Sequence, residues 1–344
     1  MEKILVIGAG FSKNVNYPLE KEVIPLIEKK LDSAAKIAEK FKEDLIHLWN
    51  DFFPHLDFWK LPIEEILSRV ELEMKYIYAR DRKRYFELTD LYEMILALFW
   101  ITISAKPTKE SLETLYNFLK SVGFPLVVIS FNQDMVVERV CEENKISWSY
   151  IDNLRLVKQK PYLYFIKTRY NFQSYQLEHP EIKLLKLHGS FNWFYCWRCL
   201  KMRFFSIQDA GHFPSVTQWP FGGRILLCAE PKCLTKAAVG QANLMPLIIA
   251  PSALKQYDLP TIYDQFLMSR ENLRNAEEII FCGYSMREED SLSVNLFYKL
   301  STLNKKVKNI IVIDPNKQVY RRIANVIQFR PQYINSLHDF NNHD

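Results

Sequence analysis

The chain has 344 residues, of which 48% are hydrophobic and 25% are charged, as in an ordinary globular protein. This length predicts two domains, or one large domain with a sizeable insertion. The 45 basic residues exceed the 40 acidic residues by only five and are interspersed with them. The net charge therefore does not indicate a nucleic-acid-binding surface, and at most allows weak binding of nucleic acid.

The first residues, MEKILVIGAG, lack the basic segment, apolar core and cleavage site of a secretory signal. The longest apolar run, at 95–105, is too short to span a bilayer and is expected to form a buried helix. Four of the six cysteines lie in two tight pairs, which suits a cytosolic metal site better than a disulfide framework. We therefore expect a cytoplasmic protein with no membrane partner.

Short runs rich in Val, Ile and Leu recur along the chain without strict alternation, which is typical of strands covered on both faces. Helical patterns lie between several of them, at 109–121 and 262–276. The fold class expected is α/β, with a Rossmann-like doubly wound parallel sheet whose ligands bind beyond the carboxyl ends of the strands. The five predicted parallel strands are 3–10, 125–132, 182–189, 277–285 and 308–316, with 245–252 as a sixth candidate.

Two regions interrupt this alternation. Residues 19–118 are mostly helical and are predicted to be an insertion after the first strand. Residues 191–244 contain the paired cysteines and are predicted to form a small zinc-binding module. The remaining segments, 1–18, 119–190 and 245–330, would together form the Rossmann-like domain.

The first strand ends in GAGFS. Gly8 and Gly10 would let the backbone approach a phosphate and present amide donors at a helix start. A GxG turn also occurs where a strand needs a tight exit, and position 13 is Lys13, so the full GxGxxG fingerprint is absent. Both interpretations stay open on this motif alone.

Two more strand ends present polar side chains. In SFNQD, Asp134 could cap the following helix. The amide of Asn132 needs several hydrogen-bond partners within the protein, or it faces a ligand. In LLKLHGSFNW, the apolar run leads to His188, which is either a core histidine or a group placed to move a proton.

The cysteine pairs are the most specific local signal. CWRC supplies Cys196 and Cys199, and CAEPKC supplies Cys228 and Cys233. Two such pairs match a four-thiolate zinc site, which is structural because it leaves no coordination position for water. Cys141 and Cys282 lie in apolar contexts and are expected to be ordinary buried cysteines.

The last two predicted strands finish in GYSM and IDPN. Gly283 and Ser285 could contact a phosphate, and Asp314 could accept hydrogen bonds from ribose hydroxyls. A carboxylate there would repel a 2′-phosphate and favour NAD over NADP. Asp314 is equally interpretable as a turn residue before Pro315.

Taken together and in this order, the motifs resemble the sirtuin superfamily, and most closely its sirtuin-like prokaryotic branch, in which many members are NAD hydrolases of antiviral defence. The similarity runs from Gly8 to Asn316, with the helical insertion as the main uncovered stretch. The matching pieces are GAGFS, SFNQD, LHGSFNW, the cysteine pairs, IIAPSALKQY, GYSMREED and IDPN.

The resemblance implies a role for each matching residue. The catalytic residues implied are His188, Asn132 and Asp134, the last two lining the nicotinamide-ribose pocket. The four cysteines would hold a structural Zn²⁺ outside the chemistry. The cofactor-binding residues implied are Gly8, Ala9, Gly10, Phe11, Ser12, Asn132, Asp134, Gly283, Tyr284, Ser285, Asp314 and Asn316.

One departure bears on the reaction. Protein-deacylating sirtuins follow the glycine motif with Gly-Ile-Pro-Asp-Phe-Arg, where this chain has KNVNYPLEKEV. Loss of the shielding Phe and Arg favours hydrolysis of NAD to nicotinamide and ADP-ribose over acyl transfer, although the cysteine pairs are a hallmark of the deacylases. The alternatives are an NAD-dependent protein deacylase and a non-catalytic subunit that binds NAD or ADP-ribose in a defence complex. The resemblance also implies a homo-oligomer and a separately encoded ATPase or nuclease partner, with 19–118 as the candidate surface.

Overall fold

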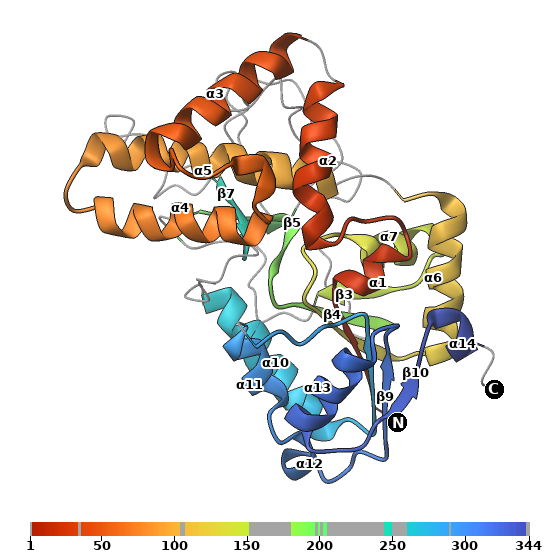
Figure 1. Ribbon diagram of the computed structural model, residues 1–344. Coiled ribbons are helices and arrows are strands. Elements are labelled where there is room, and N and C mark those ends of the chain that lie inside the picture. Colours follow the sequence, from red (N-terminus) through yellow and green to blue (C-terminus); the bar gives the residue numbers. More distant parts are fainter. Residues whose placement is uncertain are drawn as a thin grey trace.

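The computed structural model describes residues 2–33, 36–103, 107–150, 180–196, 199, 202–204, 244–249, 260–288 and 290–341. Its centre is a seven-stranded, fully parallel sheet in the order β10-β9-β8-β1-β2-β4-β3 (Figure 1). The strands are β1 Lys3–Ile7, β2 Leu126–Ser130, β3 Trp148–Tyr150, β4 Ile182–Lys186, β8 Glu278–Cys282, β9 Asn309–Ile313 and β10 Gln332–Ile334.

This sheet confirms the α/β Rossmann-like fold and the five strands expected to be parallel. From β1 the chain continues to β2 on one side, and β8, β9 and β10 later extend the sheet on the other side. The strand order therefore reverses at β1, which is where ligands bind in such sheets. Two edge strands, β3 and β10, were not predicted.

The carboxyl ends of the central strands lie in one row. Ile7 is paired with Ser130 on one side and with Cys282 on the other, and Cys282 is paired with Ile313. These strands form because short runs of Val, Ile and Leu bury both faces; all five residues of β2 are buried. The register brings the segments that follow each strand to the same edge of the sheet.

Helices cover both faces of the sheet (Figure 1). On one face α6 packs against α7 and α14, and on the other α10 packs against β4, α11 and α12. The bounds are α1 Ala9–Lys13, α6 Lys109–Val122, α7 Val136–Glu143, α10 Pro260–Asn275, α11 Ser291–Phe297, α12 Leu300–Leu303, α13 Lys317–Ile327 and α14 Leu337–Asn341.

Four helices of the predicted insertion pack on one another beside this layered part, as Figure 1 shows in red to orange. Their apolar residues recur at helical spacing: in α4, Ile63, Ile66, Leu67 and Val70 are all buried. The elements are α2 Glu20–Asp32, α3 Lys36–Phe52, the 3-10 helix η1 Phe58–Lys60, α4 Ile63–Ile77 and α5 Arg82–Ile103. The bounds of the insertion as a domain stay a prediction.

Residues 95–103 of the longest apolar run lie in helix α5. Across the described residues, no helix is both long and apolar enough to cross a membrane.

A second, antiparallel sheet has the order β6-β5-β7, with β5 Gly189–Cys196, β6 Met202–Phe204 and β7 Leu244–Ile248. The sixth candidate strand was expected to be parallel with the others, and this expectation is wrong: β7 pairs antiparallel with β5. Pro246 lies within β7 and cannot donate a ladder hydrogen bond, so this strand belongs at a sheet edge.

The turn from β4 to β5 depends on one glycine. Gly189 has φ of +72°, and a Cβ atom there would collide with the backbone carbonyl of Leu247 in β7. We expect Gly189→Ala to lower the free energy of unfolding by more than about 2 kcal/mol, because backbone strain and a backbone clash add. Thermal or urea unfolding measures this loss.

Gly123 offers a matched control. Its φ is +89°, but a Cβ atom there would meet only the flexible end of Lys3, at 3.3 Å. Gly123→Ala should therefore cost only the backbone strain. Equal losses in the two variants would contradict the clash at Gly189.

Candidate functional site

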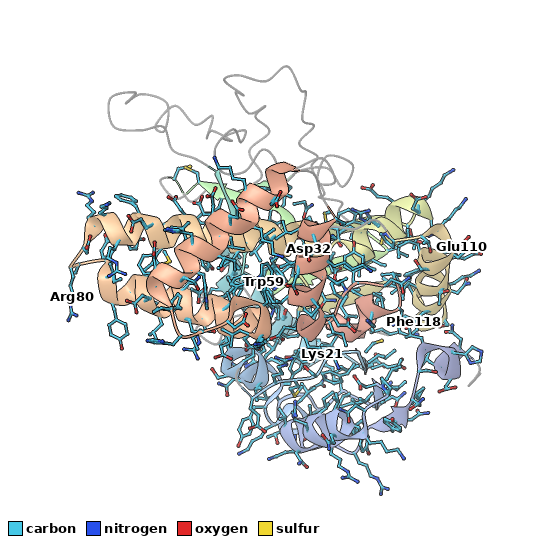
Figure 2. The ribbon with its side chains drawn as sticks, turned by 45° about the horizontal axis from the view of Figure 1, so that its top comes forward. Lys21, Asp32, Trp59, Arg80, Glu110 and Phe118 are labelled. Carbon is cyan, nitrogen blue, oxygen red and sulfur yellow. The ribbon has the colours of Figure 1, made fainter. Side chains whose placement is uncertain are left out.

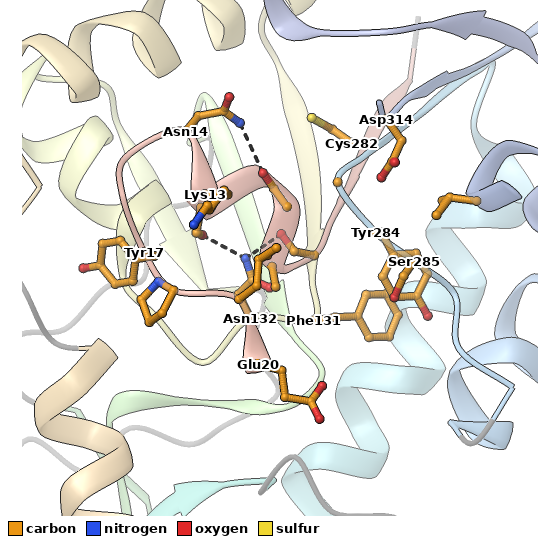
Figure 3. A pocket seen from close by; sticks show the side chains of 18 of the residues that line it. Lys13, Asn14, Tyr17, Glu20, Phe131, Asn132, Cys282, Tyr284, Ser285 and Asp314 are labelled. Atoms are coloured by element: carbon orange, nitrogen blue, oxygen red, sulfur yellow. Dashed lines mark hydrogen bonds between the residues drawn. The ribbon is translucent and has the colours of Figure 1, made fainter. Parts of the chain in front are cut away.

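A pocket of about 740 Å³ opens at the carboxyl ends of β1, β2, β8 and β9 (Figure 3). This volume is in the range of small-molecule sites. The pocket brings together nearly all the residues proposed from sequence. Those that line it are Gly8, Ala9, Gly10, Ser12, Asn132, Asp134, His188, Gly283, Tyr284, Ser285, Asp314 and Asn316.

Phe11 is the exception among the proposed binding residues. It does not line the pocket but is fully buried, with its ring 6.1 Å from that of Phe118 in α6. Within the GAGFS motif, Phe11 therefore anchors the short helix α1 to the layer of helices.

The glycines of the first turn allow two loops to touch. The N–H of Gly10 donates to the carbonyl of Gly283 at 2.9 Å, and a Cβ atom at Gly10 would lie 2.8 Å from Gly283 Cα. Gly283 itself has φ of +59°. The N–H of Phe11 donates to the carbonyl of Gly8 at 2.9 Å. The glycines thus have a packing reason that needs no phosphate, and two of the turn's amide donors are bonded within the protein.

Asn132 joins the first two strand ends, as the dashed lines of Figure 3 show. Its Nδ2 donates to the carbonyl of Gly8 and to Ser12 Oγ, both at 2.9 Å. Ser12 Oγ in turn donates to Asp134 Oδ2 at 2.7 Å. The N–H of Val136 donates to Asp134 Oδ1 at 3.0 Å, so Asp134 also fixes the start of α7. Asn132 and Asp134 both line the pocket and both hold its wall together.

His188 lies in the two-residue turn between β4 and β5. Its Nε2 is 3.0 Å from Asp290 Oδ2, and both side chains are buried. The ring of Phe131 packs edge-on against the imidazole, with the centroids 5.4 Å apart. A buried carboxylate beside an imidazole fixes its orientation and stabilises its protonated form.

Asp290 is a candidate functional residue that the sequence analysis did not predict. It lies at the end of the GYSMREED segment, where its Oδ1 accepts from the N–H of Ser293 at 3.3 Å as the N-cap of α11. An N-cap signal, Asp followed by a helical pattern, was present in the sequence. Nothing in the sequence indicated that its second oxygen meets His188, 102 residues away.

A buried ion pair supports the segment that carries Asp134. Lys186 Nζ lies 3.0 Å from Glu138 Oε1, and both side chains are 1% exposed. Lys186 Nζ also donates to the backbone carbonyl of Asp134, and the hydroxyl of Tyr150 donates to Glu138 Oε1 at 3.0 Å. The pair therefore ties the end of β4, two residues before His188, to the segment that carries Asp134.

An aromatic stack forms one wall. The rings of Phe131 and Tyr284 are nearly parallel, at 13°, with centroids 4.2 Å apart. Burial, and then the charge of Asp290, raise the pKa of Tyr284 far above its ordinary value. Tyr284 therefore stays neutral and provides an apolar face rather than a proton donor or acceptor near neutral pH.

Charged residues link the pocket to the helices of the insertion. Arg287 Nη1 lies 2.7 Å from Glu20 Oε2 of α2 and 2.8 Å from Glu64 Oε2 of α4. All three residues line the pocket. Arg287 is three residues before Asp290, and its backbone carbonyl accepts a hydrogen bond from the N–H of Asp290 at 3.2 Å. The loop that carries Asp290 is thus fixed to two helices of the insertion.

Asp314 and Asn316 follow β9. Asp314 Oδ1 accepts from the N–H of Asn316 at 2.8 Å, and Asn316 Oδ1 caps α13 through the N–H of Gln318 at 2.9 Å. Burial raises the pKa of Asp314 above its ordinary value, against the effect of the Asn316 amide. The turn interpretation of Asp314 is thus correct, and its carboxylate also lines the pocket.

Half of the proposed zinc site lies outside the described residues. Cys196 is buried at the end of β5 and Cys199 is half-buried. Cys228 and Cys233 are not among the described residues, and among those that are, no group of three or more His, Cys, Asp or Glu side chains could hold a metal. Cys141 and Cys282 are buried, as expected.

No protein-family model and no curated protein matches the sequence. Solved structures similar in fold include a "Sir2 homolog-NAD complex" with TM-score 0.47 and 13% identity, covering 99% of this chain and 86% of that one. A "Sir2-p53 peptide-NAD+" structure has TM-score 0.45 and 12% identity, covering 99% of this chain and 90% of the other. A third, titled "Structural Basis for the Mechanism and Regulation of Sir2 Enzymes", has TM-score 0.43 and 15% identity, covering 99% and 89%.

Proposed function

We propose that the protein hydrolyses NAD to nicotinamide and ADP-ribose. The observation that carries this proposal is the buried His188–Asp290 pair, at 3.0 Å, in the wall of a pocket at the switch point of the sheet. The motifs resemble those of sirtuin-like NAD hydrolases, and we propose NAD as the substrate on the basis of this resemblance. The chemistry of the pocket residues supports each step.

Cleavage of the nicotinamide-ribose bond develops oxocarbenium character at the ribose carbon, as in other glycoside chemistry. In our proposal, His188 accepts a proton from the attacking water or from a ribose hydroxyl. Asp290 holds the imidazole in place and stabilises the imidazolium that forms. The apolar rings of Phe131 and Tyr284 would lower the local polarity and strengthen that interaction.

Asn132 is a neutral group suited to orient the ribose or the water. Its amide nitrogen is committed to Gly8 and Ser12, whereas no donor within the described residues reaches its Oδ1. That oxygen could accept a hydrogen bond from a ribose hydroxyl or from the water. In this proposal Asn132 is fixed before the substrate arrives, so ordering it costs little on binding.

The proposal assigns Asp314 to the ribose hydroxyls of the adenosine half, which excludes a 2′-phosphate by charge. Because burial raises its pKa, protonation of Asp314 begins at a higher pH than for an ordinary carboxyl group. The affinity for NAD should be full where Asp314 is ionised and should fall as the pH decreases through the raised pKa. Titration calorimetry between about pH 7.5 and pH 4.5 measures this fall.

The matched variant for this pH effect is Asp314→Asn, which keeps the side-chain oxygen that the Asn316 amide contacts. We expect weaker NAD binding by this variant, with the acid-dependent component removed. If wild type and variant lose affinity in parallel as the pH falls, Asp314 is not the ribose ligand.

The test of the function is nicotinamide release from NAD by the purified protein, with and without an acetyl-lysine peptide. Release without peptide supports hydrolysis. Release that requires the peptide would assign the protein to the deacylases instead. NAD binding without release under either condition would favour the binding-subunit alternative.

We further propose that NAD depletion by this activity acts in antiviral defence. Expression of the protein in cells should then lower their NAD content when the activity is triggered, and His188→Ala should abolish that loss. An equal fall in NAD with the His188→Ala protein would contradict this role.

A further inference from the structure

The turn between α4 and α5 concentrates the positive charge of the chain. Residues 75–86, KYIYARDRKRYF, contain five basic residues and one acidic residue, a net charge of +4. The whole chain has a net charge of +5, so all other residues together contribute only +1. The same twelve residues contain four aromatic side chains.

The aromatic rings of this turn are exposed rather than packed into the helices. Tyr76, Tyr78 and Phe86 are 61%, 69% and 55% exposed. Tyr85 packs edge-on against Tyr78, with ring centroids 5.0 Å apart, which holds the rings next to one another at the tip. Exposed rings on a folded hairpin need an explanation, because burying them against α4 or α5 would be favourable.

The cations at the tip differ in their partners. Arg84 lies over the ring of Phe52 at 4.7 Å, and Lys83 is 3.7 Å from Glu87. Arg80 and Arg82 are exposed and form no ion pair with any residue that the structure describes. Two guanidinium groups are therefore available to a ligand beside Tyr76 and Tyr78.

The tip lies far from the pocket. Figure 2 shows Arg80 at one end of the molecule, with Lys21 between it and Glu110 at the other. Glu64, which lines the pocket, is at the start of α4, and the helical rise puts Tyr78 roughly 20 Å away from it. This surface is therefore independent of the proposed NAD chemistry.

We propose that the hairpin surface, formed by Tyr76, Tyr78, Arg80, Arg82 and Phe86, binds single-stranded nucleic acid. Unpaired bases stack on exposed aromatic rings, and adjacent cations contact the phosphates. The cores of protein interfaces are depleted of charge and carry their polar groups at the rim. Here exposed rings lie on both sides of a run of cations in the sequence, which fits a phosphate backbone better than an apolar protein surface.

The experiment is fluorescence anisotropy of a labelled oligothymidylate of about 20 nucleotides with the full chain, at about 50 mM and about 200 mM KCl. Arg80→Glu/Arg82→Glu should weaken binding at least about tenfold and make its salt dependence shallower. Each phosphate contact on a single strand contributes about −0.7 to the slope of log K against log[salt]. Tyr76→Ala/Tyr78→Ala should weaken binding at least about tenfold with the salt slope unchanged.

The matched control is Lys109→Glu/Lys120→Glu, which makes the same change in net charge on α6, whose start Glu110 marks in Figure 2. Both lysines are exposed, and binding should change little. Thermal midpoints of all variants, which touch only exposed side chains, report whether the fold is kept.

Three results would overturn the proposal. They are no anisotropy change at the lower salt concentration, equal weakening by the α6 control, and competition by a polyglutamate peptide as effective as that by unlabelled oligonucleotide. The last result would mean that the surface recognises negative charge alone and suits an acidic protein.

Discussion

His188→Ala should lower the rate of nicotinamide release from NAD by about 10²- to 10⁴-fold, the range that a general base contributes. The alanine removes the group that accepts the proton, and Asp290 then has no imidazole to stabilise. Steady-state rates with the purified variant, together with its thermal midpoint, measure the effect. His338→Ala, at an exposed histidine, should leave the rate unchanged.

Asp290→Asn tests whether the negative charge of Asp290 assists proton transfer to His188, apart from any role of Asp290 in holding the structure in place. Asparagine can still accept from the N–H of Ser293, so the start of α11 is kept. It cannot stabilise an imidazolium as a carboxylate does, and we expect kcat to fall with little change in KM. Full activity in Asp290→Asn would show that the pair is structural and would remove the main support for the proposed mechanism.

Lys186→Met should have the largest effect on stability, a loss of about 3–5 kcal/mol in the free energy of unfolding. The cause is the carboxylate of Glu138, which would remain buried with only the Tyr150 hydroxyl near its Oε1. Denaturant unfolding gives the change directly. Lys183→Met, at an exposed position of the same strand, should change stability by less than about 0.5 kcal/mol.

The double variant Lys186→Met/Glu138→Gln tests this explanation. Removing both charges together leaves no unpaired ion, so much of the lost stability should return. If the double variant is as unstable as Lys186→Met alone, the loss comes from packing or from the contact with the Asp134 carbonyl rather than from a buried charge.

The parallel sheet was predictable because its strands are short apolar runs buried on both faces, and such runs stand out in the sequence. Strands β3 and β10 were missed because each has only three residues and lies at a sheet edge, with little apolar signal. The direction of β7 could not be inferred from apolar content. It depends on β5 turning back immediately after His188, and the tight turn at Gly189 sets that geometry.

The site was predictable to the extent that it follows from strand ends. Asn132, His188, Gly283 and Asp314 all come just after parallel strands, so a common edge was expected to gather them. The Asp290 partner of His188 lies eight residues beyond the end of β8, where no periodic pattern fixes its position. The Arg287 contacts with α2 and α4 were equally hidden, because they depend on how the insertion docks.

The position of β1 in the middle of the sheet has a consequence for how the protein is made. Its partner β8 is separated from it by about 270 residues, so Gly10 cannot meet Gly283 until that length of chain has been synthesised. At about 5–20 residues per second, this takes roughly 14–55 s. Until then the edge of β1 that pairs with β8 has no partner strand, and the pocket lacks the side formed by the segment after β8. A nascent chain is therefore unable to assemble the site until β8 and the segment after it have been synthesised.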